Sequence, residues 1–123
     1  DRQDDHRFAW PEQYHPYIVG SLTYPQTLEV YRRYQTFINV NTVVDSPTMC
    51  ARRVYELMAS GTRVISGPSL ALDRVPVQIA TTTQEAKVIL SQSDGGAATD
   101  RVAWAQAGNL TGHRVEAILD VIA

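Results

Sequence analysis

The stretch that decides the fold runs from Phe37 to Ser66 and reads FINVNTVVDSPTMCARRVYELMASGTRVIS. Both of its ends are short apolar runs typical of buried strands, and between them lie a polar turn and a segment with helical spacing. Ser46 and Pro47 predict the start of that helix as its N-cap and first turn, and Gly61 predicts its end. A strand, a helix and a second strand in this order predict a βαβ unit with parallel strands.

The same alternation continues on the amino-terminal side of this stretch. Residues 17–19 are a short apolar run closed by glycine, which predicts another strand. The residues that follow, up to Tyr34, show helical spacing, and Ser21 or Thr23 can cap this helix with Pro25 in its first turn. A further strand and helix therefore precede the central unit.

On the carboxyl-terminal side, residues 75–80 predict a weaker strand, and we expect it at an edge of the sheet because it contains Pro76. Helices are predicted over residues 83–92, 97–107 and 112–122. The chain is therefore expected to be α/β, with a Rossmann-like parallel sheet that carries helices on both faces. In this sheet the adjacent parallel strands should be the apolar runs at residues 17–19, 37–40 and 64–65.

Length and composition set limits on the class of protein. The chain of 123 residues predicts a single domain over residues 1–123, and 44% hydrophobic with 20% charged residues is ordinary for a globular protein. A net charge of −2 argues against nucleic acid or an anionic membrane as a partner recognised through bulk charge. No run approaches the roughly 20 apolar residues of a membrane span. The single Cys50 excludes an intramolecular disulfide, which favours a cytoplasmic location. Because the chain begins at Asp1 and not at methionine, we expect it to be processed, trimmed or cut from something longer.

Glu56 is the first candidate binding residue of the central helix. On a helical wheel Cys50, Val54 and Leu57 share an apolar face, and Glu56 lies on the other side. One interpretation is an exposed glutamate paired with Arg52 one turn earlier. The other is a carboxylate that accepts hydrogen bonds from a ribose, and spacing alone does not decide between them.

The start of the same helix is a second candidate. The hydroxyl groups of Ser46 and Thr48, together with free backbone N–H groups, could hold a diphosphate at the positive end of the helix dipole. An ordinary N-cap without a ligand explains the same residues, and the carboxylate of Asp45 competes for the same donors.

Other known signatures are missing from the sequence. It has no glycine-rich dinucleotide fingerprint and no phosphate-binding loop of the nucleoside-triphosphatase type. The three histidines, His6, His15 and His113, do not have the spacing of metal ligands. Cys50 falls on the apolar face, so we expect it to be buried and not to act as a nucleophile.

At these residues the sequence resembles a known family. The stretch from Asn39 to Ser66 resembles the carboxy-terminal region of spore-maturation-type, group 1 glycosyltransferases, which have the GT-B fold and use nucleotide sugars. The likeness extends upstream through residues 17–24 and 31–34 and downstream to residues 113–119. The resemblance implies that this chain is most of the donor-binding half of such an enzyme and that the acceptor domain is absent from it.

The resemblance also implies roles for individual positions in donor binding. Glu56 matches the glutamate that contacts the donor ribose. The diphosphate would meet the turn and the helix start, at Ser46, Pro47, Thr48 and Met49. The donor cleft would lie beside the end of the following strand, at Ser66 and Gly67. Many retaining relatives carry a glutamate eight residues before the ribose glutamate, where this chain has Thr48, so the catalytic residue and the stereochemical outcome stay open.

The function expected from this resemblance is transfer of a sugar from a nucleotide diphosphate sugar, such as a UDP-sugar, to an unknown acceptor. No cofactor or metal is expected to be required. The arginine and lysine that commonly clamp the donor phosphates would lie upstream of Val19 and Gly20, so we expect this chain alone to be inactive and to self-associate. The alternative is a non-catalytic α/β interaction module or a nucleotide-sugar sensor.

Overall fold

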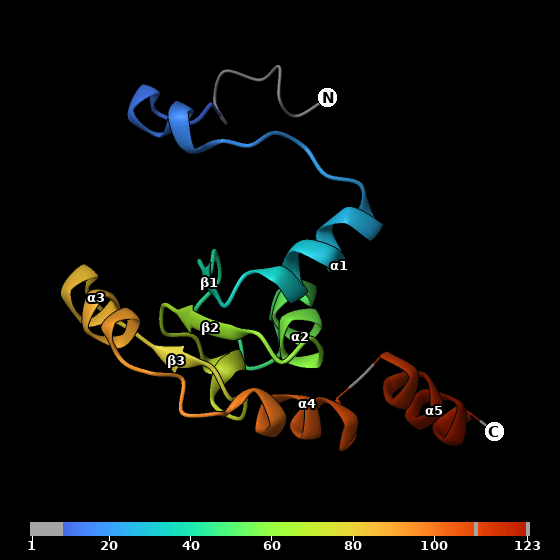
Figure 1. Cartoon of the computed structure of the whole chain (residues 1–123). Helices are drawn as coiled ribbons and strands as arrows, with labels where there is room; N and C mark the ends of the chain where they lie inside the picture. Colours follow the sequence, from blue (N-terminus) through green and yellow to red (C-terminus); the bar gives the residue numbers. More distant parts are fainter. Residues whose placement is uncertain (1–8, 110, 123) are drawn as a thin grey trace.

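Three parallel strands form the sheet of the computed structural model, which describes residues 9–109 and 111–122 (Figure 1). The strands are β1 (Thr36–Asn39), β2 (Arg63–Ser66) and β3 (Gln78–Ile79), in the order β1-β2-β3. β1 and β2 pair from Thr36 opposite Arg63 to Asn39 opposite Ser66, and β3 joins the other side of β2. This confirms the parallel βαβ unit and the edge position of the third strand.

The helices lie where the sequence places them, with one exception. They are α1 (Tyr24–Arg33), α2 (Arg52–Ala59), α3 (Thr83–Ser91), α4 (Ala98–Gln106) and α5 (Thr111–Ile122), with short 3₁₀ helices η3 (Glu12–Tyr17) and η4 (Leu70–Leu72). Local capping explains why α3 begins where the sequence predicts it. The Thr82 hydroxyl accepts a hydrogen bond from the Glu85 N–H at 3.1 Å, and the Glu85 carboxylate accepts one from the Thr81 N–H at 2.6 Å.

The exception is the start of α2, which begins at Arg52 and not at Ser46. The Ser46 hydroxyl accepts hydrogen bonds from the N–H groups of Thr48 and Met49, at 3.4 and 3.2 Å, but these close a local turn and no helix follows. Cys50 therefore lies in a loop and is half-buried, so its expected burial on the helix is wrong.

The end of α2 is as predicted. Gly61 has a φ of +71°, and its N–H donates to the Met58 carbonyl at 2.9 Å while the Thr62 N–H donates to the Leu57 carbonyl at 3.0 Å. These two bonds form a Schellman motif, which requires the left-handed conformation that glycine adopts without strain. A sharp stop here returns the chain directly into β2.

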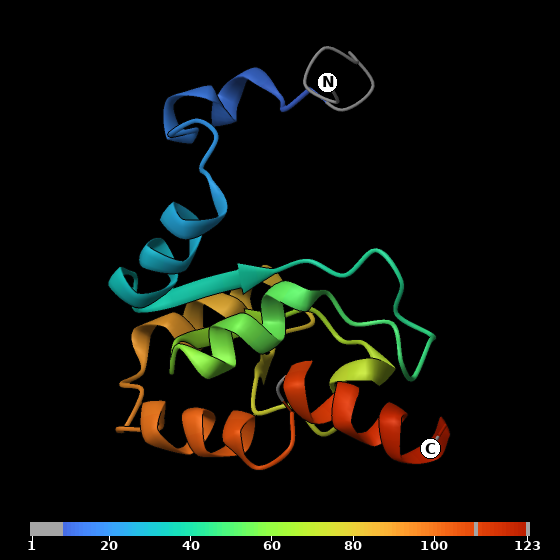
Figure 2. The same ribbon diagram turned by 90° about the vertical axis from the view of Figure 1, so that its right-hand side faces the viewer.

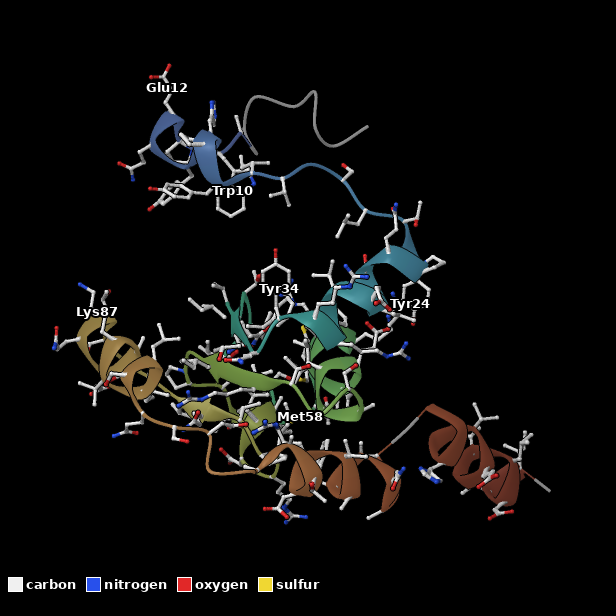
Figure 3. All side chains as sticks on the ribbon, in the orientation of Figure 1. Trp10, Glu12, Tyr24, Tyr34, Met58 and Lys87 are labelled. Carbon is white, nitrogen blue, oxygen red and sulfur yellow. The ribbon has the colours of Figure 1, made fainter. Side chains whose placement is uncertain are left out.

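The core forms between the sheet and the helices on one of its faces. Leu57 and Met58 of α2 are fully buried and belong to one cluster with Tyr31 of α1, Val64 of β2 and Ala105 of α4. Figure 3 shows Met58 on the side of α2 that faces α4. Because side chains alternate along a strand, the neighbours of Val64 point to the other face. On that face the Arg63 guanidinium donates to carbonyls at the end of α3, so α3 lies there beside β2. Helices thus lie on both faces, as expected for an α/β fold.

The predicted strand at residues 17–19 is wrong. Tyr17 is the last residue of η3, the Ile18 N–H donates to the His15 carbonyl at 3.2 Å, and Val19 is 89% exposed. The local 3₁₀ turn uses backbone groups that a strand would offer to its neighbour. Figures 1 and 2 show this segment leading away from the sheet, so β1 is an edge strand. Within the described ranges, no helix is both long and apolar enough to cross a membrane.

Candidate functional site

A buried polar network joins the carboxyl ends of β1 and β2. Asn39 and Ser66 are each 1% exposed, and the Asn39 amide donates to the Ser66 hydroxyl at 3.0 Å. The Asn41 amide donates to the same hydroxyl at 3.1 Å and to the Gly67 carbonyl at 2.8 Å. Ligands of parallel α/β sheets bind at this end of the strands, so the network forms the floor of the candidate site.

The strand-end hollow lies over this floor, between the sheet and the start of α3. It has a volume of about 460 Å³, and its lining includes Ser66 and Gly67. Ile38 and Ile65 make part of its wall apolar, and Thr83 of α3 stands at its rim. The hollow therefore offers an apolar surface beside hydroxyl and carbonyl groups.

The middle hollow lies beside it, where the chain leaves β1 and enters α2. It has a volume of about 260 Å³, and its lining includes Met49, Cys50 and Arg53. The Arg53 guanidinium donates from Nη2 to the Asn39 Oδ1 at 3.2 Å, which ties this arginine to the polar floor. The amino-terminal end of α2 borders the same hollow, so positive charge and a helix dipole meet there.

The Glu56 hollow, of about 650 Å³, lies between α1 and α2. The Glu56 side chain is 16% exposed. Its Oε1 accepts a hydrogen bond from the Tyr24 hydroxyl at 2.9 Å and forms an ion pair with the Arg52 Nε at 3.0 Å. The Arg52 guanidinium carbon also lies 5.3 Å from the centre of the Tyr24 ring, at the start of α1 (Figure 3). The hydrogen bond to Glu56 is the main reason why the pKa of Tyr24 is raised.

The three hollows are neighbours, and we refer to them together as the furrow. The strand-end and middle hollows share Val40 and Asn41, and the middle and Glu56 hollows share Ala51 and Arg53. Arg53 therefore stands at the junction between the carboxylate of Glu56 and the polar floor at the strand ends. The furrow runs along the carboxyl edge of the sheet.

The residues expected to bind a ligand are spread along this furrow and do not share one concave surface. Ser66 and Gly67 line the strand-end hollow, Met49 the middle hollow, and Glu56 the hollow that carries its name. Ser46, Pro47 and Thr48 are in the loop before α2 and are not among the residues that line these three hollows. Glu56 pairs with Arg52, as the first interpretation expects, but its side chain is only 16% exposed and lines a hollow. Its binding of a ribose stays a prediction.

Four residues of the site were not predicted as ligand contacts: Tyr24, Asn39, Asn41 and Arg53. A signal existed for Asn39 and Asn41, which are polar residues at the end of an apolar strand. Arg53 follows Arg52 on a helix that carries a candidate ribose ligand. No local pattern predicts the contact of Tyr24 with Glu56, because 32 positions separate them.

The opposite, amino-terminal edge of the sheet holds a second charged cluster, beside a polar hollow of about 580 Å³. Arg101 donates to the Gly61 carbonyl from Nε at 3.0 Å and from Nη2 at 2.8 Å, and it forms a two-point ion pair with Asp94. Arg63 donates to the carbonyls of Gln92 and Ile89 at the end of α3. These arginines hold the ends of α2 and α3, and Arg101 lowers the pKa of Asp94 mainly through its hydrogen bonds.

Among the described residues, no group of three or more histidine, cysteine, aspartate or glutamate side chains is placed to hold a metal ion. Comparisons of the chain with protein-family models, with curated proteins and with solved structures find no match. A function must therefore be argued from the furrow itself and from the sequence resemblance.

Proposed function

We propose that this chain is the donor-binding part of a glycosyltransferase that moves a sugar from a nucleotide diphosphate sugar to an acceptor. The observation that carries the proposal is the order of the three neighbouring hollows. A carboxylate, then an arginine at a helix start, then the strand ends follow one another along the furrow. This order matches the ribose, the diphosphate and the sugar of such a donor.

The ribose is assigned to the Glu56 hollow. A carboxylate has about four lone-pair sites, and Tyr24 and Arg52 both use Oε1. No described residue donates a hydrogen bond to Oε2, so this oxygen remains for a ribose hydroxyl. A hydrogen bond to a charged group contributes about 1.5 to 3 kcal/mol, which is enough to select a ribonucleotide.

The diphosphate is assigned to the middle hollow. Arg53 brings a guanidinium with several donors, and only its Nη2 has a described bond, to Asn39. The first turn of α2 adds the positive end of a helix dipole. Positive charge held at this point would stabilise the leaving diphosphate as the sugar departs, so the proposed chemistry needs no metal.

The sugar is assigned to the strand-end hollow, beside Ser66 and Gly67. Their polar groups could position its hydroxyls, and the apolar wall suits the less polar faces of a sugar ring. No residue of this chain is assigned as the catalytic base. We propose that the acceptor domain belongs to a longer protein, that this protein is cytoplasmic, and that the chain alone does not turn over a donor.

Uncovered apolar side chains support self-association of the isolated chain. Ile38 and Val40, at and just beyond the carboxyl end of the edge strand β1, are 65% and 77% exposed. On α5 the exposed residues Val115, Ile118 and Ile122 follow helical spacing. A rise of mass with concentration in analytical sedimentation is the expected result, and a strict monomer at high concentration would contradict it.

The test of donor binding is calorimetric titration of UDP-, GDP- and ADP-sugars into the chain and into Glu56→Gln. The substitution should weaken binding by about 1.5 to 3 kcal/mol. The matched control is Glu29→Gln, because Glu29 forms the same kind of pair with Arg33, at 3.0 Å, on the exposed side of α1. Equal affinities for the wild type and Glu56→Gln, or no binding of any donor, would overturn the proposal.

A further inference from the structure

The contact between Tyr24 and Glu56 joins two helices of the furrow through a candidate ligand-binding group. Tyr24 belongs to the first turn of α1, and Glu56 lies on the second turn of α2. The tyrosine hydroxyl donates to Oε1 at 2.9 Å, a charge-assisted bond to the same oxygen that Arg52 contacts. Oε1 is thus fully engaged with the protein, and Oε2 is left for a ligand.

The two donors to Oε1 are not equivalent. Arg52 is on the same helix as Glu56, four positions earlier, and its side chain is 76% exposed. Such pairs on an exposed helix surface contribute little to stability, because water and salt screen the charges. Tyr24 reaches Glu56 from another helix and has fewer rotatable bonds than an arginine.

The start of α1 is itself fixed. Thr23 and Gln26 form a capping box, in which the Gln26 side chain accepts a hydrogen bond from the Thr23 N–H at 2.8 Å, and Pro25 follows Tyr24 in the first turn. The backbone that carries Tyr24 is therefore held by local bonds. A fixed backbone makes the phenol a better brace for Glu56 than the neighbouring arginine.

We propose that Tyr24 is a positioning residue for ribose recognition. It holds the Glu56 carboxylate through Oε1 so that Oε2 meets the hydroxyls of the donor ribose. This inference rests on the proposed donor-binding function and adds a residue to it. Tyr24 makes no bond to the reacting atoms and acts only through Glu56.

The experiment compares UDP, GDP and ADP with their 2′-deoxy and 3′-deoxy counterparts by calorimetry. In the wild type at least one ribonucleotide should bind more tightly than a deoxy counterpart, and Glu56→Gln should abolish that preference. Tyr24→Phe removes only the hydroxyl and should reduce the preference about fivefold, the usual effect of one hydrogen bond, while the affinity for the deoxy nucleotide stays constant. The control is Tyr34→Phe: Tyr34 is exposed at the other end of α1 and should leave the preference unchanged.

A second readout needs no nucleotide. The ring of Tyr24 can be titrated by nuclear magnetic resonance, and its raised pKa should fall toward the ordinary value in Glu56→Gln. An unchanged pKa of Tyr24 in Glu56→Gln would mean that the two side chains are not in contact in solution. This result would overturn the role of Tyr24. If Glu56→Gln abolishes the ribose preference and Tyr24→Phe keeps it, the inference fails and the donor site stands. If the wild type shows no ribose preference, the proposed function fails together with it.

Discussion

The two ends of the sheet both carry arginine and carboxylate side chains, but they use them differently. At the amino-terminal end Arg63 and Arg101 are 4% and 5% exposed, and each of their guanidinium nitrogens donates to a protein acceptor. At the carboxyl end Arg53 has one described hydrogen bond, and one oxygen of Glu56 has no hydrogen-bond donor among the described residues. Saturated charges hold a fold together, whereas unsaturated charges beside a hollow are free to bind a ligand.

The largest effect is expected from breaking the saturated end. Arg101→Ala removes both donors to the buried Gly61 carbonyl and leaves Asp94 with only the more distant Arg63, whose Nε lies 3.9 Å away, and this should lower the free energy of unfolding by about 3 kcal/mol. Urea denaturation measures the change. Arg101→Lys keeps the charge but loses the two-point geometry, so its free energy of unfolding should lie between those of the wild type and the alanine variant. A loss below about 1 kcal/mol in Arg101→Ala would contradict a structural role for this cluster.

The next effect concerns the turn that Arg101 holds. In Gly61→Ala the new Cβ would lie 3.2 Å from the Ala98 carbonyl oxygen, at a φ of +71°. Strain of the left-handed conformation and this contact should together cost about 2 kcal/mol. Gly112→Ala is the matched control, because Gly112 lies inside α5 and its Cβ would meet nothing within 4 Å. Equal thermal stability of the two variants would refute the explanation of the turn.

The saturated end should also make stability depend on pH. Arg101 holds the pKa of Asp94 below its ordinary value, so the unfolded chain takes up a proton first as the pH falls. The stabilisation is complete above about pH 4, the ordinary pKa of an aspartate, and is lost as the pH falls through the native value. Urea midpoints measured between about pH 5 and 2 should fall less steeply in Asp94→Asn than in the wild type. Parallel curves would mean that Asp94 has no part in acid unfolding.

The smallest effect on stability is expected at the unsaturated end. Glu56→Gln should change the free energy of unfolding by less than about 0.5 kcal/mol, because its ion pair with the exposed Arg52 is weak and the glutamine oxygen can still accept the hydrogen bond from Tyr24. The same substitution should have the large effect on donor binding given above. A destabilisation above about 2 kcal/mol would show that Glu56 stabilises the fold, and it would contradict the proposed difference between the two ends of the sheet.

Local chemistry explains which parts of the fold could be predicted. The cap at Thr82, the stop at Gly61 and the apolar run of β2 act within a few residues, and the sequence indicates them directly. The serine hydroxyl at Ser46 suits a turn as well as a helix cap, which is why the start of α2 was misplaced. The apolar run at residues 17–19 carries no information on whether a neighbouring strand exists, because pairing is non-local.

The same distinction applies to the site. Helical spacing placed Glu56 off the apolar stripe, and the structure confirms that it is not part of the core cluster. The bonds of Tyr24 to Glu56 and of Arg53 to Asn39 join separate elements, so no spacing rule reveals them. Prediction from sequence therefore placed Glu56 as a candidate binding residue but did not find the groups that contact it and the strand ends.

The most direct test of the central claim is a map of backbone amide shifts by nuclear magnetic resonance as a nucleotide sugar is added to the chain. We expect the shifts to gather at the carboxyl end of the sheet, at Asn41, Arg53 and Gly67. The amide resonances of Gly61 and Arg101 at the opposite end should not shift. No shifts with any of the UDP-, GDP- or ADP-sugars, or shifts that gather at the amino-terminal end, would contradict the assignment of the furrow as a donor site.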